Sequence, residues 1–190
     1  MRLRLIIASV LSLAALADAA AQAPPAPPAP PKSAEHCPGP DLIAAVRARA
    51  GDKGDIPLQA VAAELGSSEA AILRALPEQF RVMAAGSHFS EVWADVTGWD
   101  DAVFAVSKGG NVFEIHGRIR PGEPSKKSRY FNLSPGTPGV AGHLRPDLVI
   151  TIAAVSRHVR GKEQHGIAFF DAAGAEVFGV YVPGEGDDVD

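Results

Sequence analysis

The sequence predicts an α+β fold, in which a helix-turn-helix-like N-terminal cap precedes a mainly antiparallel β-sheet with a flanking helix. Two observations carry this prediction. Between Asp41 and Phe80 the apolar residues recur at helical spacing, whereas from Ala102 to Val182 the hydrophobic pattern switches to the period of two that strands show. Glycine- and proline-bearing turns separate the alternating runs, and such short connections join neighbouring strands in antiparallel order.

The first 40 residues are expected to lie outside the folded domain. Residues 1–23 begin with two arginines, continue as an apolar run too short to span a bilayer comfortably, and end in mostly small residues, which is typical of a secretory signal peptide. Residues 24–40 form a Pro/Ala-rich linker. We therefore expect a folded domain over residues 41–183, an acidic tail over residues 184–190, and a periplasmic or secreted protein that is not membrane-spanning after signal cleavage.

The charge and the cysteine count argue against a nucleic-acid partner and against an intramolecular disulfide. The formal net charge is −4, and loss of residues 1–23, which carry two arginines and one aspartate, would make it −5. Nucleic acid is therefore not an expected partner, because binding DNA or RNA requires a cationic surface that neutralises phosphates. Cys37 is the only cysteine, so no intramolecular disulfide can form and stability must come from an apolar core.

The helical cap contains three expected helices, each bounded by residues that favour helix ends. They are the segment with Leu42, Ile43 and Val46, the segment from Pro57 to Leu65 before Gly66, and a third segment that Ser67 or Ser68 caps and that ends at Leu76 before Pro77. This is the outline of a helix-turn-helix. DNA binding is disfavoured because the third helix carries Glu69 and only one cation, Arg74. We expect the helices to cover the sheet instead.

A fourth helix is expected from Ser87, burying Phe89, Val92, Trp93 and Val96, and ending at Gly98. Strands are expected over residues 102–107, 111–116, 129–134, 147–156, 164–171 and 176–182.

The first predicted hairpin can be described residue by residue. If Gly109-Gly110 is a two-residue turn, Ser107 lies opposite Val112, and strand alternation then fixes the two faces. The more polar face can line a pocket or meet water, and the apolar face is expected to be core. The polar face would carry Val103, Ala105, Ser107, Val112, Glu114 and His116; the apolar face would carry Phe104, Val106, Phe113 and Ile115.

An ordered set of short motifs resembles the haem-utilisation carrier proteins of the ChuX/HutX type. The resemblance covers roughly Leu42 to Val182. Its motifs are Leu76-Pro77, His88-Phe89, Val92-Trp93, Trp99, Glu114 before Gly117, Pro121-Gly122, Tyr130-Phe131-Asn132-Leu133, Gly142-His143-Leu144, Phe169-Phe170 and Gly174.

This resemblance implies non-covalent haem binding and intermolecular haem transfer in bacterial iron acquisition, placed by the predicted signal peptide in the cell envelope. It implies a homodimer and a haem-degrading enzyme or haem transporter as partner. His143 falls on a haem-linked histidine and would ligate the iron, and Tyr130 falls on the tyrosine of the family's motif. A haem site also needs cations near its propionates, which Arg145, Arg118 or Arg120 can supply.

The chain departs from the family pattern at one ligand position. A second haem-linked histidine of the family corresponds to Ser107, which is a poor ligand for ferric iron. His116 shares the expected face of Ser107, but its partner Val103 lies four residues away, about 13 Å along a strand. We therefore expect His143, Tyr130, Arg145, Ser107 and His116 to be the cofactor-binding candidates.

Three functions compete at this point. The first is a haem carrier, for which no catalytic residues are expected. The second is a haem-degrading oxygenase-like enzyme, whose chemistry would come from the haem itself. The third is a structural or interaction relative that does not bind haem, in which His143 would simply hydrogen-bond in a turn.

Overall fold

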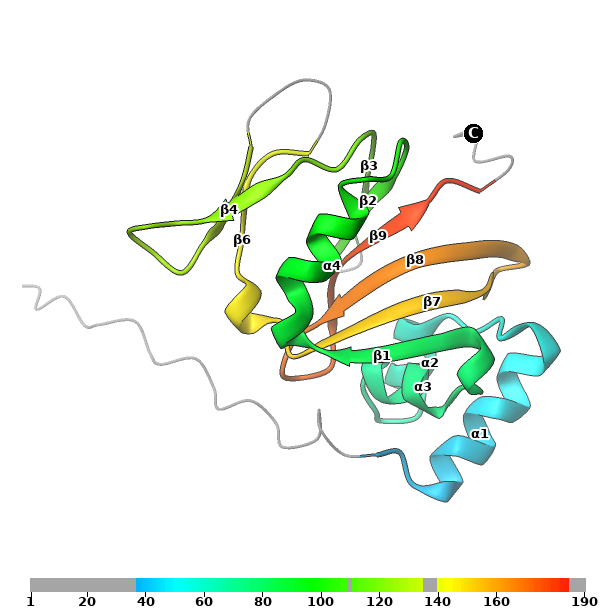
Figure 1. The fold of residues 1–190 in the computed structure, drawn as a ribbon. Helices are drawn as coiled ribbons and strands as arrows, with labels where there is room; N and C mark the ends of the chain where they lie inside the picture. The colour runs from blue at the N-terminus through cyan, green and yellow to red at the C-terminus, as the bar shows by residue number, and fades with distance from the viewer. Residues whose placement is uncertain (1–36, 109–110, 135–139, 185–190) are drawn as a thin grey trace, which may run out of the picture.

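The protein is described by a computed structural model over residues 37–108, 111–134 and 140–184. A six-stranded sheet in the order β1-β7-β8-β9-β2-β3 runs through the molecule, and each neighbouring pair is antiparallel (Figure 1). Its strands are β1 Arg81–Ala85, β2 Val103–Lys108, β3 Asn111–His116, β7 Thr151–Val159, β8 Lys162–Phe170 and β9 Glu176–Val182. With the helices below, this confirms the α+β fold expected from the sequence.

Four α-helices and a smaller sheet complete the described fold. The helices are α1 Pro40–Ala50, α2 Leu58–Glu64, α3 Glu69–Ala75 and α4 Phe89–Val96. The second, three-stranded sheet has the order β4-β5-β6, with β4 Gly122–Pro124, β5 Phe131–Leu133 and β6 His143–Leu144. Short 3-10 turns lie at η2 Gly51–Lys53, η3 Glu78–Phe80, η4 Gly86–His88 and η5 Pro146–Leu148.

The ends of the cap helices follow the signals in the sequence. Ser68 caps α3, and its hydroxyl oxygen accepts a hydrogen bond from the Ala71 N–H at 3.3 Å. Gly66 has a φ of +59°, in the left-handed region where glycine carries no steric penalty, and it follows Leu65, the C-cap of α2. The first helix begins at Pro40, one residue before the expected domain start, because proline is well suited to a first helical turn.

Each face of the large sheet is covered by a different apolar layer. The first three helices pack on one face, where Ile72, Leu73 and Leu76 are fully buried against sheet residues such as Phe170. On the other face, α4 and the small sheet enclose Phe169, whose ring centroid lies 4.5 Å from that of Phe178. Burying each such side chain stabilises the fold by roughly 1.5–3 kcal/mol. Figure 1 shows α1–α3 and α4 on opposite sides of the sheet.

The β2–β3 hairpin has the register expected from its sequence, but not the expected core. Ser107 pairs with Val112 and Val103 pairs with His116. Phe104 is buried, whereas Phe113 is 61% exposed and Ile115 is 45% exposed, so the expectation that both belong to the core is wrong. The reason is position: β3 is the edge strand of the large sheet, and the apolar cluster under α4 ends at β2.

Several elements differ from those expected. The strand expected over residues 147–156 begins only at Thr151, because Pro146–Leu148 forms the 3-10 turn η5. The segment over 129–134 contributes only β5, and it belongs to the second sheet rather than the first. Strands β1, β4 and β6 were not expected. Of the predicted acidic tail, only Gly184 is among the described residues, and of the predicted linker, only residues 37–40. The predicted signal peptide lies outside the described residues.

No helix within the described ranges is both long enough and apolar enough to cross a membrane.

Candidate functional site

The small sheet presents a polar outer face that carries the principal candidate, His143. Asn132 on β5 pairs with His143 on β6, and Phe131 pairs with Leu144. Because side chains alternate along a strand, the two pairs point to opposite sides. Phe131 packs inward against α4, with its ring 5.4 Å from that of Phe89, so Asn132 and His143 stand on the side away from the core. We call that side the outer face.

α4 holds the small sheet in place. The indole N–H of Trp93 donates a hydrogen bond at 3.1 Å to the Arg120 carbonyl, just before β4, and its ring lies 6.2 Å from that of Phe131. Trp93 is fully buried. The aromatic residues that the sequence places on one side of the fourth helix therefore orient the strands that carry the candidate residues.

The ring orientation of His143 is fixed by one neighbour. Its Nδ1 lies 2.8 Å from the Asn132 side-chain oxygen. An amide oxygen can only accept a hydrogen bond, so Nδ1 donates and a neutral ring keeps its free lone pair on Nε2. His143 is exposed, and the arrangement therefore offers one imidazole nitrogen to a ligand from solution.

Tyr130 and Arg145 join His143 at the same end of the small sheet. The Tyr130 and His143 rings are 5.7 Å apart, and the Arg145 guanidinium carbon lies 5.7 Å from the Tyr130 ring centroid. Arg145 also donates two hydrogen bonds to Asp147, at 2.7 and 2.8 Å. These bonds lower the pKa of Asp147 and raise that of Arg145. Three of the five candidates thus form one cluster.

Ser107 and His116 lie elsewhere. Their strand positions alternate with Phe104, which faces α4, so they point to the face of the large sheet that α1–α3 cover. Ser107 lines a cavity together with Leu58 and Gln59 of α2. The structure therefore does not bring Ser107 and His116 together with His143 within one chain.

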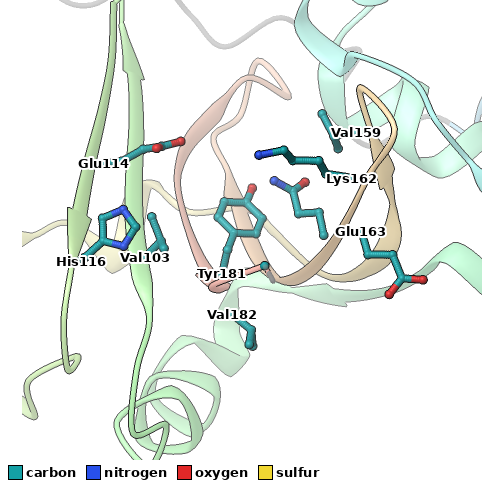
Figure 2. A pocket seen from close by; sticks show the side chains of 10 residues that line it. Val103, Glu114, His116, Val159, Lys162, Glu163, Tyr181 and Val182 are labelled. Atoms are coloured by element: carbon teal, nitrogen blue, oxygen red, sulfur yellow. The ribbon is translucent and has the colours of Figure 1, made fainter. Parts of the chain in front are cut away.

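His116 lines a cavity of about 310 Å³ between the β2–β3 hairpin and the far end of β7–β8. Figure 2 shows Glu114 and His116 on one side of it, Val159 and Lys162 on the other, and Tyr181 between them. This cavity is a second place where a histidine meets a partly apolar wall. It is separate from the outer face of the small sheet.

A partly buried cluster of polar residues that sequence reasoning missed lies beside this cavity. The Tyr181 hydroxyl donates to Glu176 at 2.7 Å, and the Glu176 backbone N–H donates to the Glu69 carboxylate at 2.6 Å. Burial raises the pKa of both carboxyl groups and of Tyr181. Arg157, only 7% exposed, donates to the Ile56 carbonyl at 2.6 Å. These residues come from α3, β7 and β9, which are distant in sequence, so no local sequence signal showed that the fold brings them together.

The outer face satisfies two requirements of a haem site. The Nε2 atom of His143 could ligate the iron of a haem, and the Arg145 guanidinium beside it could meet a propionate. Within the described part of the chain, no group of three or more histidine, cysteine, aspartate or glutamate side chains is arranged to hold a bare metal ion. The donor set at His143, one imidazole nitrogen beside a guanidinium, would suit a haem.

Comparison with known proteins identifies the relatives of this chain. The chain is 28% identical over 123 residues to the intracellular heme transport protein HutX of Vibrio cholerae, which covers 65% of this chain and 63% of HutX. The chain therefore spans less than two thirds of that relative's length. Among solved structures, the heme binding protein ChuX superposes with a TM-score of 0.65 at 23% identity, over 75% of this chain and 84% of ChuX.

The comparison with HutX contradicts the periplasmic or secreted location expected from residues 1–23, because that relative is described as intracellular. The expectation rested on a short apolar run behind two arginines, and such a run has the composition of an export signal without fixing where the folded domain works.

The family also decides between carrier and enzyme. The chain resembles ChuS, a heme oxygenase of Escherichia coli, with a TM-score of 0.60 but only 12% identity over 82% of this chain and 47% of ChuS, which shows a shared fold alone. The model of the haem utilisation ChuX/HutX family, whose members are haem-binding carriers and not enzymes, matches residues 82–189. Since the match covers more than half of the sequence, the chain belongs to the ChuX/HutX family of haem-utilisation proteins.

Proposed function

We propose that this chain binds haem non-covalently on the outer face of the small sheet and passes it to another protein. The observation that carries the proposal is the contact between His143 and Asn132, which directs the Nε2 lone pair of an exposed imidazole away from the protein. Haem, when bound, would supply the iron that this nitrogen ligates.

Tyr130 and Arg145 would orient the ligand. The Tyr130 ring is 44% exposed and tilted by 54° against the His143 ring, so it offers an aromatic surface beside the axial nitrogen. Arg145 is held by Asp147 on one side and by the Tyr130 ring on the other, which limits the entropy lost when its guanidinium meets a propionate. Ser107, on the opposite face, is not part of this site.

The openness of the outer face supports handover rather than storage. A site that leaves much of its ligand accessible lets a second protein contact the ligand before the first releases it. The relative HutX is described as a heme transport protein. We infer that this chain delivers haem to a haem-degrading enzyme or a haem transporter.

Titration with haemin tests the site directly. The native chain should give a saturable Soret band, and His143→Ala should weaken binding by at least about tenfold, equal to 1.4 kcal/mol, because the axial nitrogen is lost. Tyr130→Phe should change binding less, since its ring remains.

The matched control is His116→Ala, which removes another exposed histidine on the opposite face of the large sheet. It should leave haemin binding within about twofold of native. If His116→Ala abolishes binding and His143→Ala does not, the site is the cavity beside Tyr181. If the native chain leaves the haemin spectrum unchanged, the chain is a relative that does not bind haem.

We also propose that two copies pair as a homodimer through β3. This strand pairs only with β2 among the described residues, and it exposes Val112, Phe113 and Ile115. An open strand edge with exposed apolar side chains is suited to pairing with a second chain.

A further inference from the structure

The charges of this acidic chain are strongly segregated. Residues 118–145 hold six of the 18 lysines and arginines but only one of the 22 acidic residues, a formal charge of +5. The remaining residues therefore carry a formal charge of −9, which together with +5 gives the net charge of −4 for the whole chain. The positive segment is the one that builds the small sheet and its connections.

Four of these cations gather at one end of the small sheet. Strand pairing places Pro124 beside Phe131 and Phe131 beside Leu144, and the Ser125 N–H donates to the Tyr130 carbonyl at 2.7 Å. The next row across the sheet is therefore Ser125, Tyr130 and Arg145, with the β4–β5 connection beyond it. We define the basic rim as Lys126, Lys127, Arg129 and Arg145.

The rim lies close to His143. Arg145 follows it by two strand positions, about 7 Å, and the connection begins one row farther on. Figure 1 shows the β4 hairpin projecting away from the large sheet on the side of α4. The lysines of the rim thus lie at the border of the proposed haem site and extend beyond it.

The two lysines of the rim have no acidic partner among the residues that the structure describes. Asp147 lies 2.7 Å from Arg145 and 3.7 Å from Arg129, so one carboxylate partly neutralises these two arginines. Lys126 and Lys127 are exposed, and their ammonium groups form no ion pair with any described residue. A haem has two propionates, for which the arginines nearer His143 suffice. The lysines are therefore available to a different anionic partner.

The size of the rim and the charge of the rest of the chain favour one kind of partner. A membrane surface or a nucleic acid is an extended polyanion, and the residues outside 118–145, which carry a formal charge of −9, would repel it. A compact acidic patch on a protein can meet the rim alone. Opposite charges on two such patches raise the association rate and fix the orientation of the encounter.

We infer that the basic rim is the docking surface for an acidic patch of a partner protein, which it aligns with the exposed imidazole at position 143. The alignment with haem rests on the proposed function, whereas the docking itself depends only on charge and exposure.

The probe is a fluorescein-labelled twelve-residue peptide of alternating glutamate and serine, followed by fluorescence anisotropy with the full chain. The native chain should bind it, and Lys126→Glu/Lys127→Glu should weaken binding by at least about tenfold, because two attractions become repulsions. Lys126→Gln/Lys127→Gln should lie between them. Binding should also fall between about 0.05 and 0.5 M salt as the charges are screened.

The matched control is Lys53→Glu/Lys108→Glu, which changes the net charge equally at exposed lysines of η2 and β2, outside the small sheet. It should keep peptide binding within about twofold of native. Equal losses in the two double variants, or no binding by the native chain, would overturn the docking surface. Stronger binding of the native chain to vesicles with anionic lipid than to the peptide would also overturn it, in favour of a membrane.

Haemin titration separates this inference from the proposed function. Lys126→Glu/Lys127→Glu should bind haemin as the native chain does, and loss of haemin binding would make the lysines part of the haem site instead. A chain that binds the peptide but not haemin would refute the proposed function and leave the docking surface standing. A chain that binds haemin but not the peptide would refute the docking surface alone.

Discussion

Asn132 fixes the tautomer and the ring orientation of His143, which the sequence motif alone does not predict. The motifs around the two residues lie eleven positions apart, and pairing of β5 with β6 brings their side chains to 2.8 Å. A histidine in a flexible turn would sample both tautomers and many ring orientations. Because the amide oxygen takes the Nδ1 proton, the nitrogen presented to an incoming iron is Nε2.

The candidate residues illustrate how far the sequence predicts the site. His143, Tyr130 and Arg145 lie close together in the chain and do form one cluster. Ser107 and His116 were predicted on one face of a hairpin, and that is correct, but the face is opposite the small sheet. Strand alternation shows which residues share a face, whereas the layer that covers each face depends on contacts distant in sequence.

Glu176 makes stability depend on pH. Burial raises the pKa of its carboxyl above the ordinary 4.5, with a lowering by the Tyr181 hydroxyl and a raising by Glu69 as smaller effects. The folded state therefore favours the protonated carboxyl. The contribution of this carboxyl to the free energy of unfolding is complete below pH 4.5 and is lost as pH rises through the raised pKa. Glu69 acts in the same direction.

We predict that Glu176→Gln increases the free energy of unfolding relative to the native chain, by a margin that grows as pH rises above about 4.5. The margin grows because glutamine does not titrate. Urea unfolding at a series of pH values measures it, with the exposed Glu123→Gln as control. A margin independent of pH would contradict the burial of this carboxyl.

At the scale of elements, helices were easier to predict than short strands. Ser68, Gly66 and Pro77 mark helix ends by their own chemistry, and the structure confirms each. Strands β4 and β6 have three and two residues, too few to show alternation. Their formation depends on pairing with β5 rather than on local sequence.

The exposed edge of β3 carries a prediction of its own. The apolar side chains of Phe113 and Ile115 face solvent in the single chain, and pairing of two copies would remove them from water. We predict that Phe113→Ser/Ile115→Ser shifts the protein from dimer to monomer, as measured by light scattering after size-exclusion chromatography.

The control for this experiment is Val177→Ser, which removes an exposed apolar side chain from β9, a strand inside the large sheet. It should leave the mass unchanged. A native chain that is monomeric at the highest concentration tested would refute the dimer, and an unchanged mass in the β3 variant would place its interface elsewhere.

On the scale of the whole molecule, the large sheet separates two different surfaces. One side carries α1–α3 and the partly buried polar cluster around Glu176, and the other carries α4 and the small sheet with its positive charge. The composition shows only that the chain is mildly acidic. It predicts neither that the two surfaces lie on opposite sides of the sheet nor which of them carries the positive charge. The family of the chain could be identified from the order of short motifs, and three residues of those motifs, Phe89, Trp93 and Phe131, form aromatic contacts between α4 and the small sheet.

The most direct measurement of the central claim is the loss of amide signals in a nitrogen-15 correlation spectrum when ferric haem is added, because unpaired electrons on iron broaden the nearest resonances. With haem on the outer face, the signals of Tyr130, Asn132, His143 and Arg145 should disappear first, and those of His116 and Tyr181 should persist. Broadening centred on His116 and Tyr181, with the small sheet unaffected, would contradict the account.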